Sequence, residues 1–345
     1  MSLKSEAYRG RSVLITGGLG FIGSNLAHRL VEMDGVNVCI VDAMVEDQGG
    51  HTFNIDAIKD RVDLHILDIA DRFEIERSIG KFDFVFNLAG NVSHLDSMVW
   101  PLRDLEANCR AQLTFLETCR KFNPDLRIIF ASTRQVYGKP RYLPIDEAHA
   151  CTPIDVNGVH KLAAEQYHLL YHRVYGLRAT CLRLTNTYGP RQLIHHPRQS
   201  VIAWFIRQAL TGGTIELYGG GQQKRDFNYV DDVVDALLTA GASREAEGEV
   251  FNLGGAETSL RELATQLIEL TGRGTILSAP FPPERQSIDI GDCYSSFQKI
   301  KASLGWQPRI SLTEGLSRTL DYYQKYYDEY CHAHVDSVSG SLATA

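Results

Sequence analysis

Three features are missing from the sequence, and each absence excludes a class of protein. The seven cysteines form no CxxC pair and no cysteine–histidine spacing of a zinc site, so we predict mostly buried thiols and no metal. No basic block stands out against a net charge of −7, which argues against nucleic acid as a partner. The start MSLKSEAYRGR lacks the apolar core of a signal peptide, and no apolar run could span a bilayer. These absences favour a protein of the reducing cytoplasm without membrane contact.

What the sequence does have is an apolar share of 44%, enough for a large core, and a regular alternation of short β-branched runs with helical stretches. The runs are nearly continuous in apolar residues, which is typical of strands buried on both faces. The alternation predicts an α/β fold with a doubly wound parallel sheet. The expected strands are SVLIT (12–16), VNVCIVD (36–42), VDLHIL (62–67), FDFVFNL (82–88), RIIFAS (127–132) and RATCLRL (178–184).

The clearest helical pattern lies at 102–120, where apolar residues recur at spacings of three and four and predict one buried face. These residues are Leu102, Leu105, Cys109, Leu113 and Leu116. After residue 185, proline and glycine interrupt the alternation, and helices are expected at about 200–211, 229–241, 259–271 and 312–328. This change predicts a smaller, mostly helical C-terminal lobe.

A glycine pattern lies between the first strand and the helix that follows it. In VLITGGLGFIGSNLAHRL, Gly17, Gly20 and Gly23 form a GxxGxxG arrangement. Glycines there allow a tight turn and a close approach of a pyrophosphate, and the helix N-terminus supplies free N–H groups and a positive dipole end. In this strand–turn–helix context the pattern predicts a Rossmann dinucleotide site; the alternative is a tight turn without a ligand.

Two acidic residues at strand ends indicate which dinucleotide is bound. Asp42 ends the second strand, 19 residues past Gly23. A carboxylate there accepts hydrogen bonds from both ribose hydroxyls and repels a 2′-phosphate, so it favours NAD over NADP. Asp68 ends the third strand and is a candidate acceptor for the adenine amino group; its alternative role is a helix N-cap.

We therefore expect an NAD-binding Rossmann domain at 1–185, with a return of the chain at about 224–254. The substrate lobe then takes 186–223 and 255–330, and 331–345 form a loose tail.

An ordered set of motifs carries a resemblance to a known family. The blocks GGLGFIGSN, LDIAD, FNLAG, ASTRQVYG, the helix of Lys161, LRLTNTYGPR and RDFNYVDDVVDA follow one another over about residues 12–330. The chain resembles the extended short-chain dehydrogenase/reductases, specifically the NAD-dependent nucleotide-sugar epimerases and dehydratases such as UDP-glucose 4-epimerase. The resemblance implies NAD as cofactor and a nucleotide-diphosphate sugar as substrate. It also implies cofactor contacts from Phe21, Ile22, Ile69, Leu88, Ala89, Gly90 and Lys161.

In that family a serine or threonine, a tyrosine and a lysine act together, with the tyrosinate taking a proton from a sugar hydroxyl. The resemblance places the hydroxyl residue at Thr133 and the lysine at Lys161, but the tyrosine position is Asn157. An amide has no useful pKa and cannot serve as a general base. We expect Asn157 to position the substrate by hydrogen bonding.

The neighbouring positions narrow the reaction. Dehydratases resemble STDEVYG, and decarboxylating members carry a glutamate before VYG, whereas this chain has Arg134 and Gln135 there. Neither side chain is a carboxylate, so by elimination an epimerase, an isomerase of carbohydrate metabolism, is favoured. The resemblance also assigns Asn186, Arg225 and Arg285 to the sugar diphosphate, for which paired guanidinium groups are well suited.

A substitute for the missing tyrosine could come from three places. His160 and Lys161 share a helix face with Asn157, and His94 follows a strand end near the expected nicotinamide. His160 titrates near neutral pH but is also explained as a surface imidazole, and Lys161 becomes a base if burial and NAD lower its pKa. Three hypotheses stay open: an epimerase with a substitute base, a related dehydrogenase or dehydratase, and a non-catalytic binding protein. The resemblance implies a homodimer built from helices at about 102–121 and 157–174.

Overall fold

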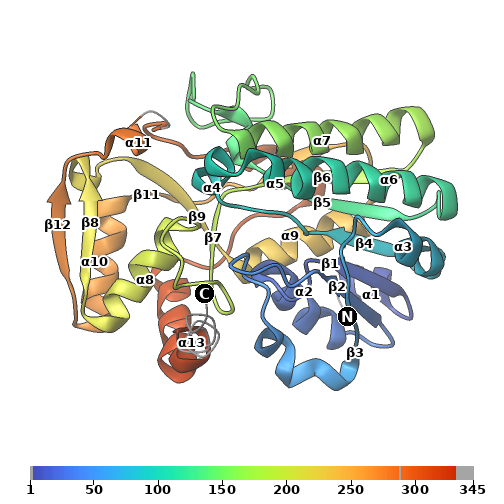
Figure 1. Ribbon diagram of the computed structural model, residues 1–345, viewed down its shortest axis with the longest axis horizontal. Helices are drawn as coiled ribbons and strands as arrows, with labels where there is room; N and C mark the ends of the chain where they lie inside the picture. The colour runs from blue at the N-terminus through green and yellow to red at the C-terminus, as the bar shows by residue number, and fades with distance from the viewer. Residues whose placement is uncertain (1–2, 287–288, 332–345) are drawn as a thin grey trace, which may run out of the picture.

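A seven-stranded parallel sheet forms the centre of the computed structural model, which describes residues 3–286 and 289–331 (Figure 1). Its strands lie in the order β10-β6-β5-β4-β1-β2-β3. The six strands expected from apolar runs are confirmed, and the sheet is of the doubly wound type. Their bounds are β1 (Ser12–Thr16), β2 (Asn37–Asp42), β3 (Val62–Ile66), β4 (Phe84–Asn87), β5 (Arg127–Thr133), β6 (Arg178–Leu184) and β10 (Val250–Asn252). The strand order reverses between β1 and β4, where α/β sheets of this type bind ligands.

Helices cover both faces of this sheet. Successive residues of β1 point to opposite faces, so Val13 and Ile15 belong to one apolar core and Leu14 to another. The first core is closed by α1 (Leu3–Tyr8), α2 (Phe21–Val31) and α9 (Val230–Ala242). The second is closed by α3 (Arg72–Ser78), α6 (Ala111–Phe122) and α7 (Val156–Tyr175), and α6 and α7 lie side by side over the sheet (Figure 1).

The helix expected at 102–120 exists, but its buried face was predicted correctly only in part. It consists of α5 (Pro101–Leu105), a π-helical segment η3 (Glu106–Arg110) and α6, and it follows the short α4 (His94–Val99). Leu102 is 74% exposed, whereas Asp104, Asn108 and Gln112 are buried. Leu116 is buried in the second core and Leu113 packs against it, as expected. In the first half of the helix apolar spacing failed as a guide, because the inner face there makes polar contacts instead.

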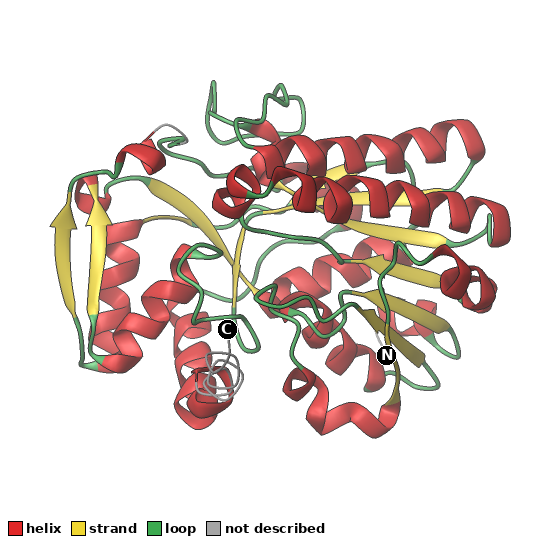
Figure 2. Cartoon of the chain, in the orientation of Figure 1, coloured by secondary structure: helices red, strands yellow, loops and turns green. Residues whose placement is uncertain are grey.

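The second lobe contains helices and two small sheets (Figure 2). Three of its helices, together with α9 of the large domain, match the expected ranges within three residues, whereas the small sheets, made of strands of three to six residues, were not foreseen. The helices are α8 (Val201–Thr211), α10 (Leu260–Thr271), α11 (Pro283–Gln286), α12 (Gln298–Leu304) and α13 (Leu312–Cys331). The sheets pair β7 (Asn186–Tyr188), β9 (Lys224–Tyr229) and β11 (Glu257–Ser259), and separately β8 (Thr214–Tyr218) and β12 (Thr275–Ala279).

Short 3-10 segments fill several connections: η1 (Thr52–Arg61), η2 (Ile79–Lys81), η4 (Arg134–Tyr137), η5 (Gly219–Gly221) and η6 (Arg244–Ala246). Between 224 and 254 the chain enters the small sheet as β9 and then rejoins the large domain as α9 and β10. Residues 332–345 of the expected tail lie outside the described part of the chain. None of the helices in the described ranges has the length and apolarity that crossing a membrane requires.

Candidate functional site

A cavity of about 900 Å³ lies at the carboxyl ends of the strands of the large sheet and extends to the second lobe. The sequence predicted a set of site residues, and of those whose side chains the structure describes, glycines included, all but His160 line this cavity. They are Gly17, Gly20, Phe21, Ile22, Gly23, Asp42, Asp68, Ile69, Leu88, Ala89, Gly90, His94, Thr133, Asn157, Lys161, Asn186 and Arg225. The fold therefore brings residues from both lobes to one cavity.

The turn after β1 forms one wall of the cavity from backbone atoms. Gly17 has a φ of +68°, and a Cβ on Gly23 would lie 2.3 Å from the carbonyl oxygen of Gly17, so only glycine allows this packing. Gly20 caps α2 without any side-chain hydrogen bond, so the cap residue satisfies none of the N–H groups at the helix start. This cradle fits the pyrophosphate of a dinucleotide.

The two acidic residues at strand ends also line the cavity. Asp42 accepts hydrogen bonds from the backbone N–H of Leu19 at 3.0 Å and of Met44 at 2.8 Å, and burial raises the pKa of its carboxyl group. Asp68 accepts from Ala70 N–H at 2.8 Å. The N-cap of α3 is Asp71, so helix capping does not account for Asp68.

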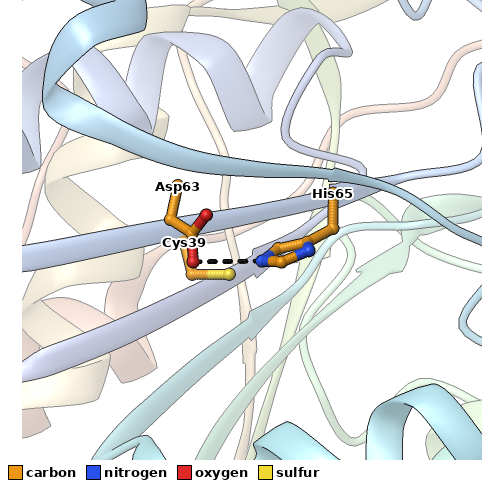
Figure 3. Close-up of side chains that lie close together, drawn as sticks. All are labelled: Cys39, Asp63 and His65. Atoms are coloured by element: carbon orange, nitrogen blue, oxygen red, sulfur yellow. Dashed lines mark hydrogen bonds and ion pairs between the residues drawn. The ribbon is translucent and has the colours of Figure 1, made fainter.

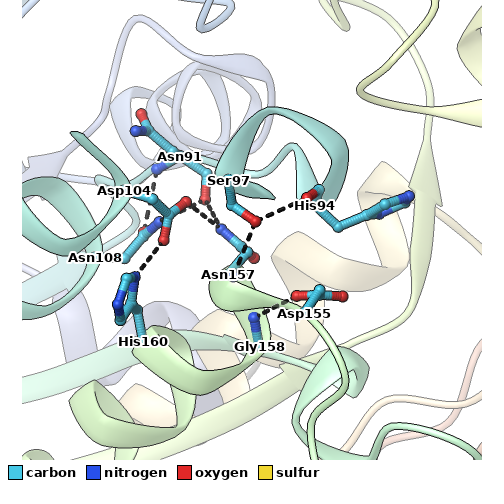
Figure 4. Close-up of polar contacts among 9 residues, drawn as sticks. All are labelled: Asn91, His94, Ser97, Asp104, Asn108, Asp155, Asn157, Gly158 and His160. Atoms are coloured by element: carbon cyan, nitrogen blue, oxygen red, sulfur yellow. Dashed lines mark hydrogen bonds and ion pairs between the residues drawn. The ribbon is translucent and has the colours of Figure 1, made fainter. Parts of the chain in front are cut away.

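Asn157 lines another wall of the cavity and lies in a buried polar network (Figure 4). Its amide nitrogen donates to the carbonyl oxygen of Asn91 and to Oδ2 of Asp104, both at 2.9 Å. Asn108 donates to the same two oxygens, each at 3.0 Å, and its own Oδ1 accepts from Asn91 N–H at 3.1 Å. Ser97 Oγ accepts from the backbone N–H of Asn157 at 3.1 Å. Asn157 is thus an integral part of the wall and only 2% exposed.

This network is part of a polar stripe on one helix. Asp104, Asn108 and Gln112 follow at spacings of four and all face the loop after β4. Gln112 donates to Ala89 O at 3.0 Å and accepts from Asn87 Nδ2 at 2.7 Å. Sequence analysis missed this stripe, although its spacing was visible, because polar residues at helical spacing usually mark an exposed face.

Lys161 is one turn beyond Asn157 on α7. Its amino group lies 4.5 Å from the centre of the Phe130 ring, and among the described residues it makes no hydrogen bond or ion pair. Burial lowers the pKa of Lys161 to about 8, and Asp104 partly opposes that shift. A buried lysine with this pKa is able to exchange protons near neutral pH.

The other candidates for proton transfer differ in their position. His160 lies outside the cavity lining, and its Nδ1 lies 2.7 Å from Oδ1 of Asp104. His94 does line the cavity, where its Nδ1 lies 3.3 Å from Nε2 of Gln135. Thr133 ends β5, and its hydroxyl accepts from Gln135 N–H at 3.2 Å, so the hydroxyl hydrogen is available to a substrate oxygen.

At the far end of the cavity, two guanidinium groups lie close together. Arg134 donates to Asn186 Oδ1 at 3.3 Å, and Asn186 Nδ2 donates to Asp226 O at 2.9 Å. Burial and then the charge of Arg134 lower the pKa of Arg225 to about 10. Burial also raises the pKa of Asp226 to about 7, so this carboxyl compensates the two cations only in part. An anion between the guanidinium groups would stabilise both.

Arg285 falls in α11, but its side chain lies outside the part of the chain that the structure describes. Sequence analysis considered Arg134 only as a missing carboxylate and overlooked its place in this cationic end. No signal in the sequence places the two guanidinium groups of Arg134 and Arg225 next to each other, because 91 residues separate them.

One cluster away from the cavity combines groups that bind metals in other proteins. Cys39 on β2 lies near Asp63 and His65 on β3, with His65 Nε2 3.0 Å from Asp63 Oδ2 (Figure 3). Burial, assisted by Asp63, raises the pKa of the Cys39 thiol to about 12. A thiol that stays protonated is a poor metal ligand, so we assign no ion to this cluster.

The chain is similar to a known protein family and to several curated proteins. A family model described as the NAD dependent epimerase/dehydratase family matches residues 13–254. The UDP-glucose 4-epimerase of Mycolicibacterium smegmatis is 32% identical over 319 residues, covering 90% of this chain and 98% of that protein. Further relatives are described as decarboxylases or dehydratases.

Solved structures are similar over almost the whole chain. An epimerase of Methanothermobacter thermautotrophicus superposes with a TM-score of 0.88 at 28% identity, covering 96% of this chain and 97% of that one. The UDP-glucose 4-epimerase of Thermotoga maritima, determined with UDP-glucose, has a TM-score of 0.83 at 33% identity and covers 92% of this chain and 99% of that one.

Proposed function

The chain belongs to the NAD-dependent epimerase/dehydratase family, and on that premise we propose that it is an NAD-dependent nucleotide-sugar epimerase whose proton acceptor is Lys161. The observation that carries this proposal is the position of Lys161. It is buried, lines the cavity together with Thr133 and Asn157, and has a pKa lowered to about 8. Among the candidates for proton transfer it is the one whose titration the structure shifts toward neutral pH while it faces the cavity.

The residues of the first wall fit the cofactor. The glycine turn and the uncapped start of α2 would hold the pyrophosphate, and Asp42 would accept from the adenosine ribose. When bound, the dinucleotide supplies a nicotinamide that takes a hydride from a carbinol carbon of the sugar and returns it to the opposite face. Its positive charge would lower the pKa of Lys161 further, which favours the free amine.

The residues of the second wall then carry the proton chemistry. As the C–H and O–H bonds of one sugar carbinol break and a C=O bond forms, the amine of Lys161 takes the hydroxyl proton. Lys161 gives the proton back to the same oxygen when the carbinol forms again with inverted configuration. Thr133 donates a hydrogen bond to the reacting oxygen, and Asn157 accepts one from a neighbouring sugar group. Each proton is accounted for without a tyrosine.

The cationic end is suited to the diphosphate of the substrate. Arg225 and Arg134 line the cavity, and Arg285 follows on the adjacent segment. Paired guanidinium groups bind phosphate oxygens in a bidentate manner, which supports a nucleotide-diphosphate sugar as the substrate class. Gln135 also lines the cavity, and its buried Oε1 lacks a hydrogen-bond partner among the described residues.

The test is direct. The protein with bound NAD is incubated with UDP-, GDP-, CDP- and dTDP-sugars, and proton NMR follows the appearance of an epimer. Conversion of one or more sugars is expected from the wild type. Asn157→Tyr serves as the comparison, because it restores the side chain that the related epimerases use. If that variant converts a sugar nucleotide and the wild type converts none, the natural protein is a binding module and the enzyme proposal fails.

We also propose a homodimer formed through α6 and α7. These helices lie side by side, and large apolar side chains are exposed on them and on the segment before α6: Leu102, Phe122, Val159, Leu170 and Val174. Covering such a surface removes apolar area from water, as in obligate dimers. Light scattering at micromolar concentration should give twice the chain mass. A monomeric mass would contradict the proposal.

A further inference from the structure

Asp104 is a deeply buried carboxylate that bonds three side chains, one of which, Asn157, lines the cavity. Only 3% of its side chain is exposed. Oδ2 accepts from the amides of Asn157 at 2.9 Å and Asn108 at 3.0 Å, and Oδ1 lies 2.7 Å from Nδ1 of His160 (Figure 4). A buried carboxylate is costly unless its oxygens are bonded in this way. The network therefore has one arrangement in which every partner is satisfied.

This arrangement decides how Asn157 faces a ligand. A carboxylate can only accept hydrogen bonds, and the carbonyl oxygen of Asn91 can only accept as well. Both N–H groups of the Asn157 amide are therefore used on the side of Asp104, and the amide cannot flip without placing its oxygen against two acceptors. The remaining group, Oδ1, points away from Asp104 in Figure 4. Asn157 thus offers the cavity an acceptor and no donor.

Asp104 also raises the pKa of Lys161, which lies one helical turn beyond Asn157 on the same face of α7. The groups that face Lys161 come from three further elements. Cys181 on β6 is a neutral thiol because burial raises its pKa well above the ordinary value, and Phe130 on β5 presents its ring. On α7 itself, Glu165 is paired with Arg183 at 2.6 Å, and burial lowers the pKa of His168 to about 4. Asp104 is the carboxylate that acts most strongly on the ammonium form.

We propose that Asp104 is a positioning residue that fixes Asn157 as a one-way hydrogen-bond acceptor and that its charge, which lies next to Asn157 and about one helical turn from Lys161, favours the ammonium form of that lysine. The inference rests on the proposed function, because it gives Asn157 and Lys161 their roles toward a sugar. It also names the chemistry that the wall selects. A sugar group that donates a hydrogen bond, such as a hydroxyl or an acylamino N–H, is accepted opposite Asn157, and a carboxylate or carbonyl oxygen at that place is rejected.

Competitive labelling tests the effect on Lys161 without any turnover. The protein is treated with a trace of acetic anhydride at a series of pH values, and mass spectrometry follows acetylation of Lys161. Asp104→Asn keeps the size of the side chain and removes its charge. We expect the labelling pKa of Lys161 to fall by about one unit, the lower end of the shift caused by a nearby opposite charge. An unchanged pKa in a folded Asp104→Asn variant would overturn the proposal, whereas an absence of enzymatic activity would not affect this readout.

A second variant tests the positioning of Asn157 and remains available if Asp104→Asn does not fold. Asp104→Glu keeps the charge but moves the carboxylate by one methylene, so the bond to Asn157 cannot close in the same geometry. Binding of the sugar nucleotide identified in the conversion test, or of UDP-glucose if none converts, should weaken about tenfold in calorimetry, whereas the Lys161 labelling pKa should stay near that of the wild type. Unchanged affinity would show that Asp104 has only a structural role.

Asp96→Asn is the matched control for both measurements. Asp96 is a nearby, mostly buried carboxylate on α4 that pairs with Arg198 at 3.1 Å and does not bond Asn157. This variant should leave the Lys161 labelling pKa and the sugar-nucleotide affinity unchanged. A shift as large as that of Asp104→Asn would show that any lost charge near α4 and α5 has this effect, and would overturn the assignment to Asp104.

Discussion

Two walls of the cavity, the glycine turn after β1 and the network around Asn157, differ in the kind of group that they present to a ligand. The turn after β1 offers the cavity backbone atoms, and its requirement is the absence of side chains at Gly17 and Gly23. The wall around Asn157 offers side chains, which are oriented by partners 53 to 66 residues away in the sequence. A backbone site is therefore visible in a short sequence window. A site made of side chains depends on contacts that only the folded chain reveals.

The largest effect on binding is expected from a substitution in the glycine turn after β1. In Gly23→Ala the new Cβ would meet the carbonyl oxygen of Gly17 at 2.3 Å, and backbone must shift to relieve the clash. Overpacking of this kind costs about 1–3 kcal/mol, so dinucleotide affinity should fall by roughly fivefold to over a hundredfold. Titration with NAD measures the loss. Gly80→Ala is the control, since its Cβ would find its nearest neighbour at 3.7 Å; equal losses in both variants would count against the cradle.

The second effect separates the cationic end from the cofactor wall. Arg225→Ala, and likewise Arg285→Ala, should weaken sugar-nucleotide binding while NAD binding stays intact. Loss of a charge-assisted hydrogen bond costs roughly 1.5–3 kcal/mol, which is about tenfold to over a hundredfold in affinity. Calorimetry with the sugar nucleotide and with NAD measures both. Arg309→Ala, an exposed arginine in the same lobe, should change neither, and unchanged sugar-nucleotide affinity in the two site variants would remove these arginines from the site.

A third variant asks whether the side-chain wall serves binding or only stability. Asn157→Ala removes two donated hydrogen bonds and leaves buried acceptors unsatisfied, which should lower the free energy of unfolding by about 1–3 kcal/mol. Asn123→Ala is its structural counterpart, because Asn123 also donates to two carbonyl oxygens, at 2.9 and 2.8 Å, away from the cavity. Denaturant unfolding should show similar losses. Only Asn157→Ala should also weaken sugar-nucleotide binding, and equal binding in both variants would make Asn157 purely structural.

The smallest effect concerns selectivity at the end of β2. Asp42→Ala removes the carboxylate that would accept from the ribose and repel a 2′-phosphate, so the preference for NAD over NADP should shrink while NAD binding persists. Comparing the two dissociation constants measures it. If the wild type binds both dinucleotides equally well, Asp42 does not select the cofactor.

The difference between the glycine turn and the wall around Asn157 also explains which parts of the fold and the site could be predicted from the sequence. Strands β1, β2, β4, β5 and β6 were predicted because buried parallel strands are apolar along their whole length, and Asp42 was found because it ends one of them. The edge strand β3 was also predicted, but it is mostly exposed rather than buried on both faces. The wall around Asn157 was only half predicted. The family resemblance located Asn157 and Lys161, but Asp104 was missed because its helix was oriented by apolar spacing, and Leu102 proved to be exposed. The small sheets of the second lobe were missed because strands as short as Asn186–Tyr188 carry no periodic signal.

The central claim is that Lys161 accepts the proton, and the pH dependence of epimer exchange tests it most directly. A base must be unprotonated to act, so the rate should fall as the pH drops below the pKa of Lys161, with an acid limb at or below about 8 because bound NAD favours the amine. Lys161→Met, checked by titration to retain NAD, should lose exchange at every pH. Exchange that persists in an NAD-bound Lys161→Met variant, with the acid limb unchanged, would contradict the account.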